Sequence, residues 1–179
     1  IRLRDLLYGL MLRSGNDAAV AIAEYISGDV DSFAALMNQE AAAMGATRSH
    51  FVNPNGLPDE NHYTCVYDMY LIFSNAIKND TFVSIIGTTS YDVTSTDASG
   101  ESVTHTWENT NQYLTGNATT PDGFQIVGGK TGTTGEAGYC LVLYSYNPSG
   151  QPIISIVFKA DGKSNLYLLM NEMLQGFAI

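Results

Sequence analysis

The chain has 179 residues, of which 45% are apolar and 15% are charged, and 18 acidic against 8 basic side chains give it a formal charge of −10. This apolar fraction is ample for a buried core, so the composition excludes a disordered tail and a disulfide-dense miniprotein. An acidic surface without a basic run repels phosphate backbones, which excludes nucleic acid as a partner, and no apolar stretch approaches the roughly 18 residues of a membrane span.

The first two predicted elements are helices separated by a sharp break. Apolar residues recur at helical spacing over residues 2–13, and the pattern stops at the sequence Ser14-Gly15-Asn16. A helix of small residues follows, for which Asn16 or Asp17 is the expected cap. The glycine at position 28 is expected to end this second helix.

Two further helices are predicted before the pattern changes. The third is expected to start at Asp31 or Ser32 and to end at Gly45, and a turn-rich loop follows it. The fourth is expected over residues 67–77, with Thr64 as its cap.

After Ile86 the spacing shifts from helical to alternating, which predicts strands. The five expected strands cover residues 88–94, 103–107, 125–131, 139–146 and 153–158. The last two are joined by Asn147-Pro148-Ser149-Gly150, a strong turn signal for an antiparallel hairpin. A final helix carries one apolar stripe suited to cover a face of the sheet, made of Leu166, Leu169, Met170, Met173 and Leu174.

Two short motifs carry the candidate chemistry. Lys130-Thr131-Gly132 lies on a predicted strand after a glycine pair, and Ser14-Gly15-Asn16 lies in the break between two predicted helices. They match the Lys-Thr-Gly and the looser Ser-x-Asn patterns of class A β-lactamases and penicillin-binding proteins. A second Ser-x-Asn triplet, which begins at Ser145, falls in the predicted hairpin turn, where turn chemistry explains it.

Longer segments carry a wider resemblance. Residues 5–19, residues 51–57 followed by 67–69, and residues 129–134 with 137–142 closely resemble the D-alanyl-D-alanine carboxypeptidases, the low-molecular-mass penicillin-binding proteins. The resemblance covers nearly the whole chain. It implies an α/β fold of the β-lactamase and transpeptidase type, in which helices cover an antiparallel sheet. About residues 1–86 would be a helical lobe and about 87–179 the sheet portion of one partial catalytic domain.

This resemblance also implies a function for the parent protein. A serine-type carboxypeptidase of this family removes the terminal D-alanine from peptidoglycan stem peptides that end in D-Ala-D-Ala, through an acyl-enzyme and outside the cytoplasmic membrane. β-Lactams would acylate the same serine. No metal or cofactor is implied, and a family-level membrane anchor and second β-domain would follow Ile179.

The first motif of the family, Ser-x-x-Lys, does not occur in these 179 residues. The most similar pair is Ser74 and Lys78, whose spacing is one residue longer than the motif requires. Because the sequence opens with Ile1 and only 13 residues precede Ser14, we expect a truncation rather than a loss of activity. The fragment alone is then expected to be inactive. It is also expected to expose apolar surface, and so to be unstable, self-associated or complemented by another segment.

The resemblance assigns the second motif to proton transfer. Ser14 would be the hydroxyl that passes a proton to the leaving amine. The amide of Asn16 would donate to a substrate carbonyl and help to orient the lysine of the first motif. The alternative for both residues is a helix cap, and the neighbouring Asp17 and Glu136 are assigned no catalytic role.

The third motif is assigned to substrate binding. Lys130 would tune the proton network and attract the free carboxylate of the peptide, with the hydroxyl of Thr131 as a direct donor and that of Thr133 as a weaker candidate. Gly132 has no side chain, so a substrate backbone could approach the strand and pair with its edge. The alternative for Lys130 is a solvated lysine on a strand.

Other residues and other functions remain as alternatives. Cys65 and Cys140 do not have the spacing of a metal site, and we interpret them as two small buried side chains or as a single disulfide. The three histidines, His50, His62 and His105, do not have the spacing of a zinc site. A D,D-endopeptidase of the same family, a class A β-lactamase and a peptidoglycan-binding pseudoenzyme are the competing functions.

Overall fold

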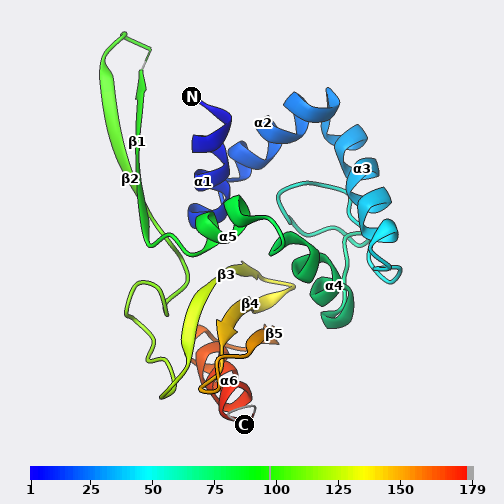
Figure 1. Cartoon of the computed structure of the whole chain (residues 1–179). Coiled ribbons are helices and arrows are strands. Elements are labelled where there is room, and N and C mark those ends of the chain that lie inside the picture. Colours follow the sequence, from blue (N-terminus) through cyan, green and yellow to red (C-terminus); the bar gives the residue numbers. More distant parts are fainter. Residues whose placement is uncertain (97, 177–179) are drawn as a thin grey trace.

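The computed structural model describes residues 1–96 and 98–176, in which six helices and two antiparallel sheets are formed. The helices are α1 (Leu3–Arg13), α2 (Asn16–Ser27), α3 (Val30–Ala43), α4 (Val66–Ala76), α5 (Asp80–Ile86) and α6 (Lys163–Gly176). The strands are β1 (Ser90–Thr96), β2 (Ser102–Glu108), β3 (Gln125–Thr134), β4 (Gly138–Tyr146) and β5 (Pro152–Ala160). This order confirms the predicted α/β class (Figure 1).

The larger sheet has three strands in the order β3-β4-β5, so β3 is an edge strand within the described residues. All neighbouring strands are antiparallel, with Lys130 opposite Val142 and Gly132 opposite Cys140. The predicted turn between β4 and β5 is confirmed, and the N–H of Gly150 closes it on the carbonyl of Asn147 at 2.9 Å. The edge position leaves one side of the Lys130 strand unpaired.

Helices cover both faces of this sheet (Figure 1). On one face α6 packs against β4 and β5, which confirms the predicted role of the last helix. Leu169 is the exception in its predicted stripe, because it is exposed at 39% whereas Tyr167 enters the core at 5%. On the other face α4 and α5 pack through Phe73 and Ile86. The sheet is therefore the middle layer, and α1 to α3 extend from its α5 side.

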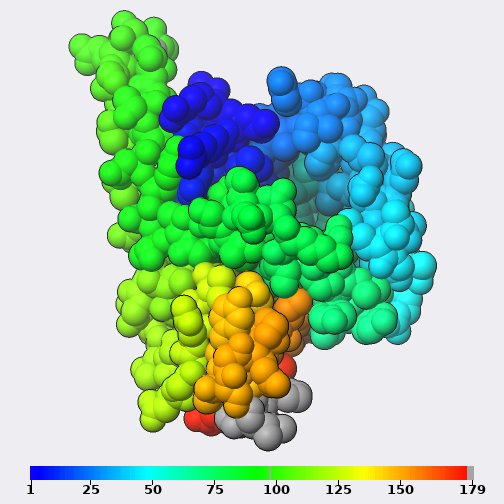
Figure 2. Space-filling view, viewed as in Figure 1, coloured from blue at the N-terminus to red at the C-terminus, as the bar shows by residue number. Residues whose placement is uncertain are grey.

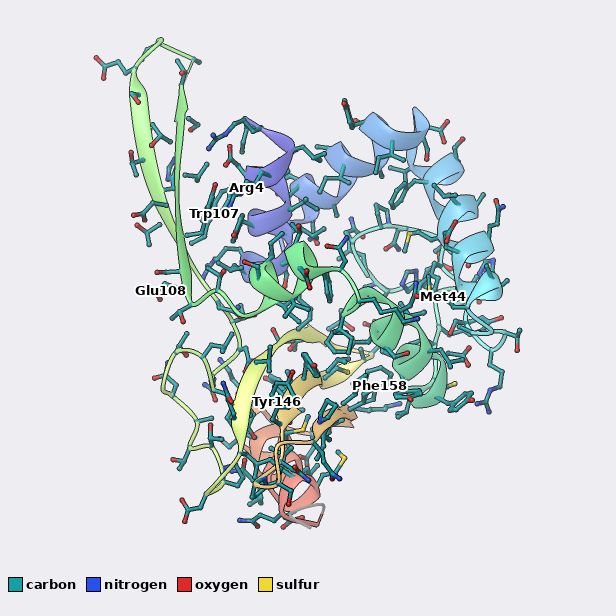
Figure 3. The ribbon with its side chains drawn as sticks, in the orientation of Figure 1. Arg4, Met44, Trp107, Glu108, Tyr146 and Phe158 are labelled. Carbon is teal, nitrogen blue, oxygen red and sulfur yellow. The ribbon has the colours of Figure 1, made fainter. Side chains whose placement is uncertain are left out.

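Strands β1 and β2 form a hairpin that projects from the body of the molecule, as Figure 2 shows. Its base is attached to α1. The ring of Tyr91 stacks on Tyr8 with centroids 3.8 Å apart, and its hydroxyl donates to the buried carboxylate of Asp5 at 2.7 Å. Trp107 turns toward α1 (Figure 3), where a Cβ on Gly9 would lie 3.1 Å from the indole. Aromatic contacts with α1 thus hold the hairpin.

The start of α2 differs from the prediction. Gly15 is the N-cap, so neither Asn16 nor Asp17 has that position, and Asn16 is the first helical residue. No side chain caps the helix, and the carboxylate of Asp17 accepts the N–H of Ala18 at 2.9 Å. The cap prediction was wrong because the backbone already turns at Ser14. The next helix therefore begins one residue earlier than a cap at Asn16 would allow.

Two other helix starts also shift, and one helix was missed. The cap of α3 is Asp29 rather than Asp31 or Ser32, because its carboxylate accepts the N–H of Ser32 at 2.7 Å. The cap of α4 is Cys65 rather than Thr64, whose hydroxyl lies 2.8 Å from a serine hydroxyl of the preceding loop. The seven-residue helix α5 has no counterpart among the predicted elements.

Cys65 and Cys140 are free thiols and each is half-buried, so of the two readings the disulfide is wrong. Within residues 1–96 and 98–176, no group of three or more histidine, cysteine or acidic side chains is placed to hold a metal ion. None of the helices in that part of the chain combines the length and the apolar character needed to span a bilayer.

Candidate active site

Ser14 lies at the sharp turn between α1 and α2. It is the C-cap of α1 and has a left-handed backbone with φ 56° and ψ 43°. Its N–H donates to the carbonyl of Leu10 at 3.0 Å, and the N–H of Gly15 donates to that of Gly9 at 3.2 Å. Because a side chain with a Cβ is disfavoured in this region, the turn is a strained one, and it places the hydroxyl of Ser14 at the surface.

Lys130 reaches this hydroxyl from strand β3. Its amine donates hydrogen bonds to Oγ of Ser14 and, at 2.7 Å, to the carbonyl oxygen of Thr131. Burial disfavours the charged form of the amine and lowers the pKa of Lys130 to about 8 from an ordinary value of 10.5. The amine therefore stays mainly cationic at pH 7, yet it can give up its proton more readily than a solvated lysine.

The two glycines before Lys130 allow β3 to approach its neighbours closely. A Cβ on Gly128 would lie 2.6 Å from the carbonyl oxygen of Ile86, at the end of α5. A Cβ on Gly129 would run into the carbonyl oxygen of Val142 on β4. Only glycine fits at either position, and this close packing fixes the strand that carries the amine.

The next residues of β3 present different groups. Thr131 is half-buried, and its hydroxyl lies 2.6 Å from the hydroxyl of Thr110, a residue of the loop after β2. Gly132 and Thr133 are exposed, and a Cβ on Gly132 would meet nothing closer than Cβ of Cys140 at 3.9 Å. The strand is therefore open to an approaching backbone at Gly132.

A cavity of about 320 Å³ brings both motifs together. It is lined by residues of the helix break and of β3 together with two cationic side chains, Arg13 and Lys163. The full lining is Arg13, Ser14, Thr110, Thr131, Gly132, Thr133, Tyr139, Lys163, Leu166 and Tyr167. Cations and hydroxyl groups around one small space suit an anionic group such as a carboxylate.

A second and larger cavity of about 1010 Å³ shares Gly132 with the first. The loop that contains Phe51 and Leu57 forms one wall, and the end of β3 with Glu136 and Cys140 contributes to the other. Asn16 lines neither cavity, and its exposed amide makes no hydrogen bond within the described chain. Of the predicted site residues, the structure brings Ser14 and the Lys130 strand together and leaves Asn16 apart.

Comparison with known proteins identifies the family of this chain. The family described as D-alanyl-D-alanine carboxypeptidase, peptidase family S11, matches residues 1–162. The chain belongs to this family. It is 34% identical over 172 residues to the D-alanyl-D-alanine carboxypeptidase DacF of Bacillus subtilis, covering 96% of this chain and 41% of the relative. It is also 34% identical over 190 residues to the D-alanyl-D-alanine carboxypeptidase of a Streptomyces strain, K15, covering 100% of this chain and 62% of the relative.

The fold of a solved structure agrees with this membership. The crystal structure of the Streptomyces K15 DD-transpeptidase matches with a TM-score of 0.86 and 33% identity, covering 98% of this chain and 68% of that chain. A variant of the same enzyme matches with a TM-score of 0.90 at 32% identity. The predicted transpeptidase-type fold is confirmed. The present chain spans less than two thirds of the length of the DacF and K15 relatives.

Six residues that line the smaller cavity were not among the predicted site residues: Arg13, Thr110, Tyr139, Lys163, Leu166 and Tyr167. Arg13 directly precedes the Ser-x-Asn motif, so its position next to Ser14 was the available signal. Lys163 begins α6 and Thr110 lies in a loop, and neither belongs to a motif or to a periodic pattern. Both reach the cavity only through the packing of distant segments.

Proposed function

We propose that this chain forms the proton-relay and carboxylate-binding side of a serine-type D-Ala-D-Ala carboxypeptidase. The hydrogen bond from Lys130 to Ser14, beside a cavity with two further cations, is the observation that carries the proposal. The whole protein would remove the terminal D-alanine from peptidoglycan stem peptides and would act outside the cytoplasmic membrane, where that substrate lies. Residues 1–86 and 87–179 would be the helical lobe and the sheet portion of its catalytic domain.

The cationic cavity supports binding of a free C-terminal carboxylate. Lys130, Arg13 and Lys163 concentrate positive charge in a chain whose formal charge is −10. A peptide carboxylate is attracted by this local potential, and the hydroxyl of Thr131 adds a directional donor. The unpaired edge of β3 at Gly132 would pair with the substrate backbone as an added strand.

The Lys130–Ser14 pair supports proton delivery. When the peptide C–N bond breaks, the leaving D-alanine amine takes the proton of the Ser14 hydroxyl, and Ser14 takes one from the amine of Lys130. The lowered pKa of Lys130 makes that second transfer easier. The new ester forms on a serine that a neighbouring base has activated.

We propose that this nucleophile and its lysine belong to a Ser-x-x-Lys segment of the whole protein. The 179 residues contain no such motif, and in the family the serine of this motif is also the one that β-lactams acylate. The chain alone would then bind substrate without cleaving it.

The test compares the protein as its gene encodes it with this chain alone. Each is incubated with a peptide ending in D-Ala-D-Ala and, separately, with a fluorescent penicillin. Released D-alanine and intact mass under denaturing conditions are measured. The encoded protein should release D-alanine and carry the penicillin on a serine outside residues 1–179, and the chain alone should do neither. An adduct on Ser14, or D-alanine release by the chain alone, contradicts the proposal.

A further inference from the structure

One residue outside both motifs contacts the two elements that form the site, with its side chain on one and its backbone on the other. The hydroxyl of Thr110 lies 2.6 Å from the hydroxyl of Thr131, and both residues line the smaller cavity. The backbone N–H of Thr110 donates to the carbonyl of Leu12 at 3.2 Å, two residues before Ser14. Thr110 therefore bridges the helix end that carries Ser14 and the strand that carries Lys130.

The segment that holds Thr110 is fixed by its neighbours. Asn109 is buried, its N–H donates to the carbonyl of Thr89 at 2.8 Å, and its side-chain amide donates to the carbonyl of Thr88 at 2.9 Å. The carboxamide oxygen of Asn109 accepts the N–H of Asn111, itself fully buried, at 2.9 Å. Because the flanking residues are held in this way, the backbone that carries Thr110 is fixed beside β3.

We propose that Thr110 is a positioning residue for recognition of the substrate carboxylate, through the hydroxyl of Thr131. This inference rests on the proposed function. The hydroxyl of Thr110 donates to Oγ1 of Thr131, and the proton of Thr131 is thereby left for the carboxylate.

The chemistry of two hydroxyl groups in contact supports this direction. A hydroxyl has one proton and two acceptor lone pairs, so only one member of a pair donates to the other. If Thr131 donated to Thr110, its proton would be used inside the protein and the carboxylate would lose a donor. When Thr110 donates, the bond polarises the hydroxyl of Thr131 and makes it a stronger donor. It also holds Thr131 in one rotamer, so less side-chain freedom is lost on binding.

The experiment uses the protein as its gene encodes it, with kinetics on a peptide ending in D-Ala-D-Ala. Thr110→Val removes the hydroxyl and keeps the shape, Thr110→Ala is a second deletion with less steric risk, and Thr110→Ser restores the hydroxyl. The matched control is Thr104→Val, because Thr104 forms a similar hydroxyl pair with Thr94 at 3.0 Å on the projecting hairpin. Melting temperatures are measured for every variant.

The two hydroxyl deletions should raise KM about tenfold, which corresponds to one hydrogen bond to a charged group, while kcat stays within about twofold. Thr110→Ser and Thr104→Val should keep the wild-type KM. An unchanged KM in both deletions, an equal loss of kcat, or a failure of Thr110→Ser to restore KM would overturn the inference while the wild-type enzyme still turns over. A wild-type protein that leaves the peptide intact would overturn the proposed function itself and this inference with it.

Discussion

The amine of Lys130 donates a hydrogen bond to the hydroxyl of Ser14 across 116 residues of sequence. Each partner is held in an unfavourable state. Ser14 has a left-handed backbone at φ 56°, and burial lowers the pKa of Lys130. Conformational strain and an unfavourable charge are typical of residues kept for chemistry rather than for stability.

Replacement of Ser14 separates strain from chemistry. Ser14→Gly and Ser14→Ala both remove the hydroxyl, so both should lower kcat of the whole protein by about 100-fold or more. Glycine accepts the left-handed backbone without the Cβ penalty, so Ser14→Gly should exceed Ser14→Ala in free energy of unfolding by about 1 kcal/mol. Denaturant unfolding and D-alanine release measure the two effects. Equal stabilities would contradict the strain, and a retained kcat would contradict the relay.

Lys130→Met should leave the free energy of unfolding at pH 7 unchanged or raise it by about 1–2 kcal/mol, because it removes a charge that burial disfavours. The wild-type penalty is fully present below pH 8. Between pH 8 and 10.5 the unfolded chain binds the proton that the folded chain has released, so wild-type stability should rise with pH across this range. Urea unfolding at pH 7, 8.5 and 10 should show this rise in the wild type and a smaller one in the variant. A variant that is less stable at every pH would contradict the interpretation.

Much of this arrangement could be predicted because the signals are local. The break at Ser14, the turn at residues 147–150 and the stripe of the last helix depend on neighbouring residues alone. Helix α5 escaped prediction because seven residues are too few to show a helical period, and Phe82, Ile85 and Ile86 read equally well as part of a strand. Its cap signal was present, since the side chain of Asn79 accepts the N–H groups of the first turn.

The site was predictable only in part for a related reason. Ser14 and Lys130 belong to motifs, so the family resemblance could pair them before any contact was known. Thr110 and Lys163 have no such signal, because their contact with the cavity depends on how a polar loop and the start of α6 pack against β3. The caps at Asn16 and Thr64 were misplaced because the observed caps, Gly15 and Cys65, make no side-chain cap hydrogen bond, so a search for capping side chains passes over them.

Two glycines of β3 give a matched pair for testing the open strand edge. A Cβ on Gly132 meets no atom closer than 3.9 Å, so Gly132→Ala should keep the wild-type melting temperature and raise KM about tenfold by keeping a substrate backbone away from the edge. A Cβ on Gly129 collides with the carbonyl of Val142, so Gly129→Ala should lower the free energy of unfolding by about 2 kcal/mol or more. Thermal unfolding and peptide kinetics distinguish the two. A wild-type KM in Gly132→Ala would contradict substrate pairing at this edge.

The contact between Asp5 and Tyr91 should make the attachment of the hairpin sensitive to acid. Hydrogen bonds from Arg2 and then from Tyr91 lower the pKa of Asp5 to about 2 from an ordinary 3.8. The stabilisation is therefore fully present above pH 4 and is lost as pH falls toward 2. Tyr91→Phe keeps the stack on Tyr8 and removes the hydroxyl.

This variant should lower the free energy of unfolding by about 1–2 kcal/mol at pH 7, because it removes a hydrogen bond to a buried carboxylate. The loss should be smaller at pH 2.5, which lies between the ordinary pKa of 3.8 and the folded-state pKa of about 2, so that part of the stabilisation has already been lost. Urea unfolding at the two pH values measures the difference. Tyr25→Phe, at a tyrosine that is 78% exposed, is the control and should change neither value. A cost for Tyr91→Phe that is equal at both pH values would show that the carboxylate charge of Asp5 does not contribute to holding the hairpin on α1.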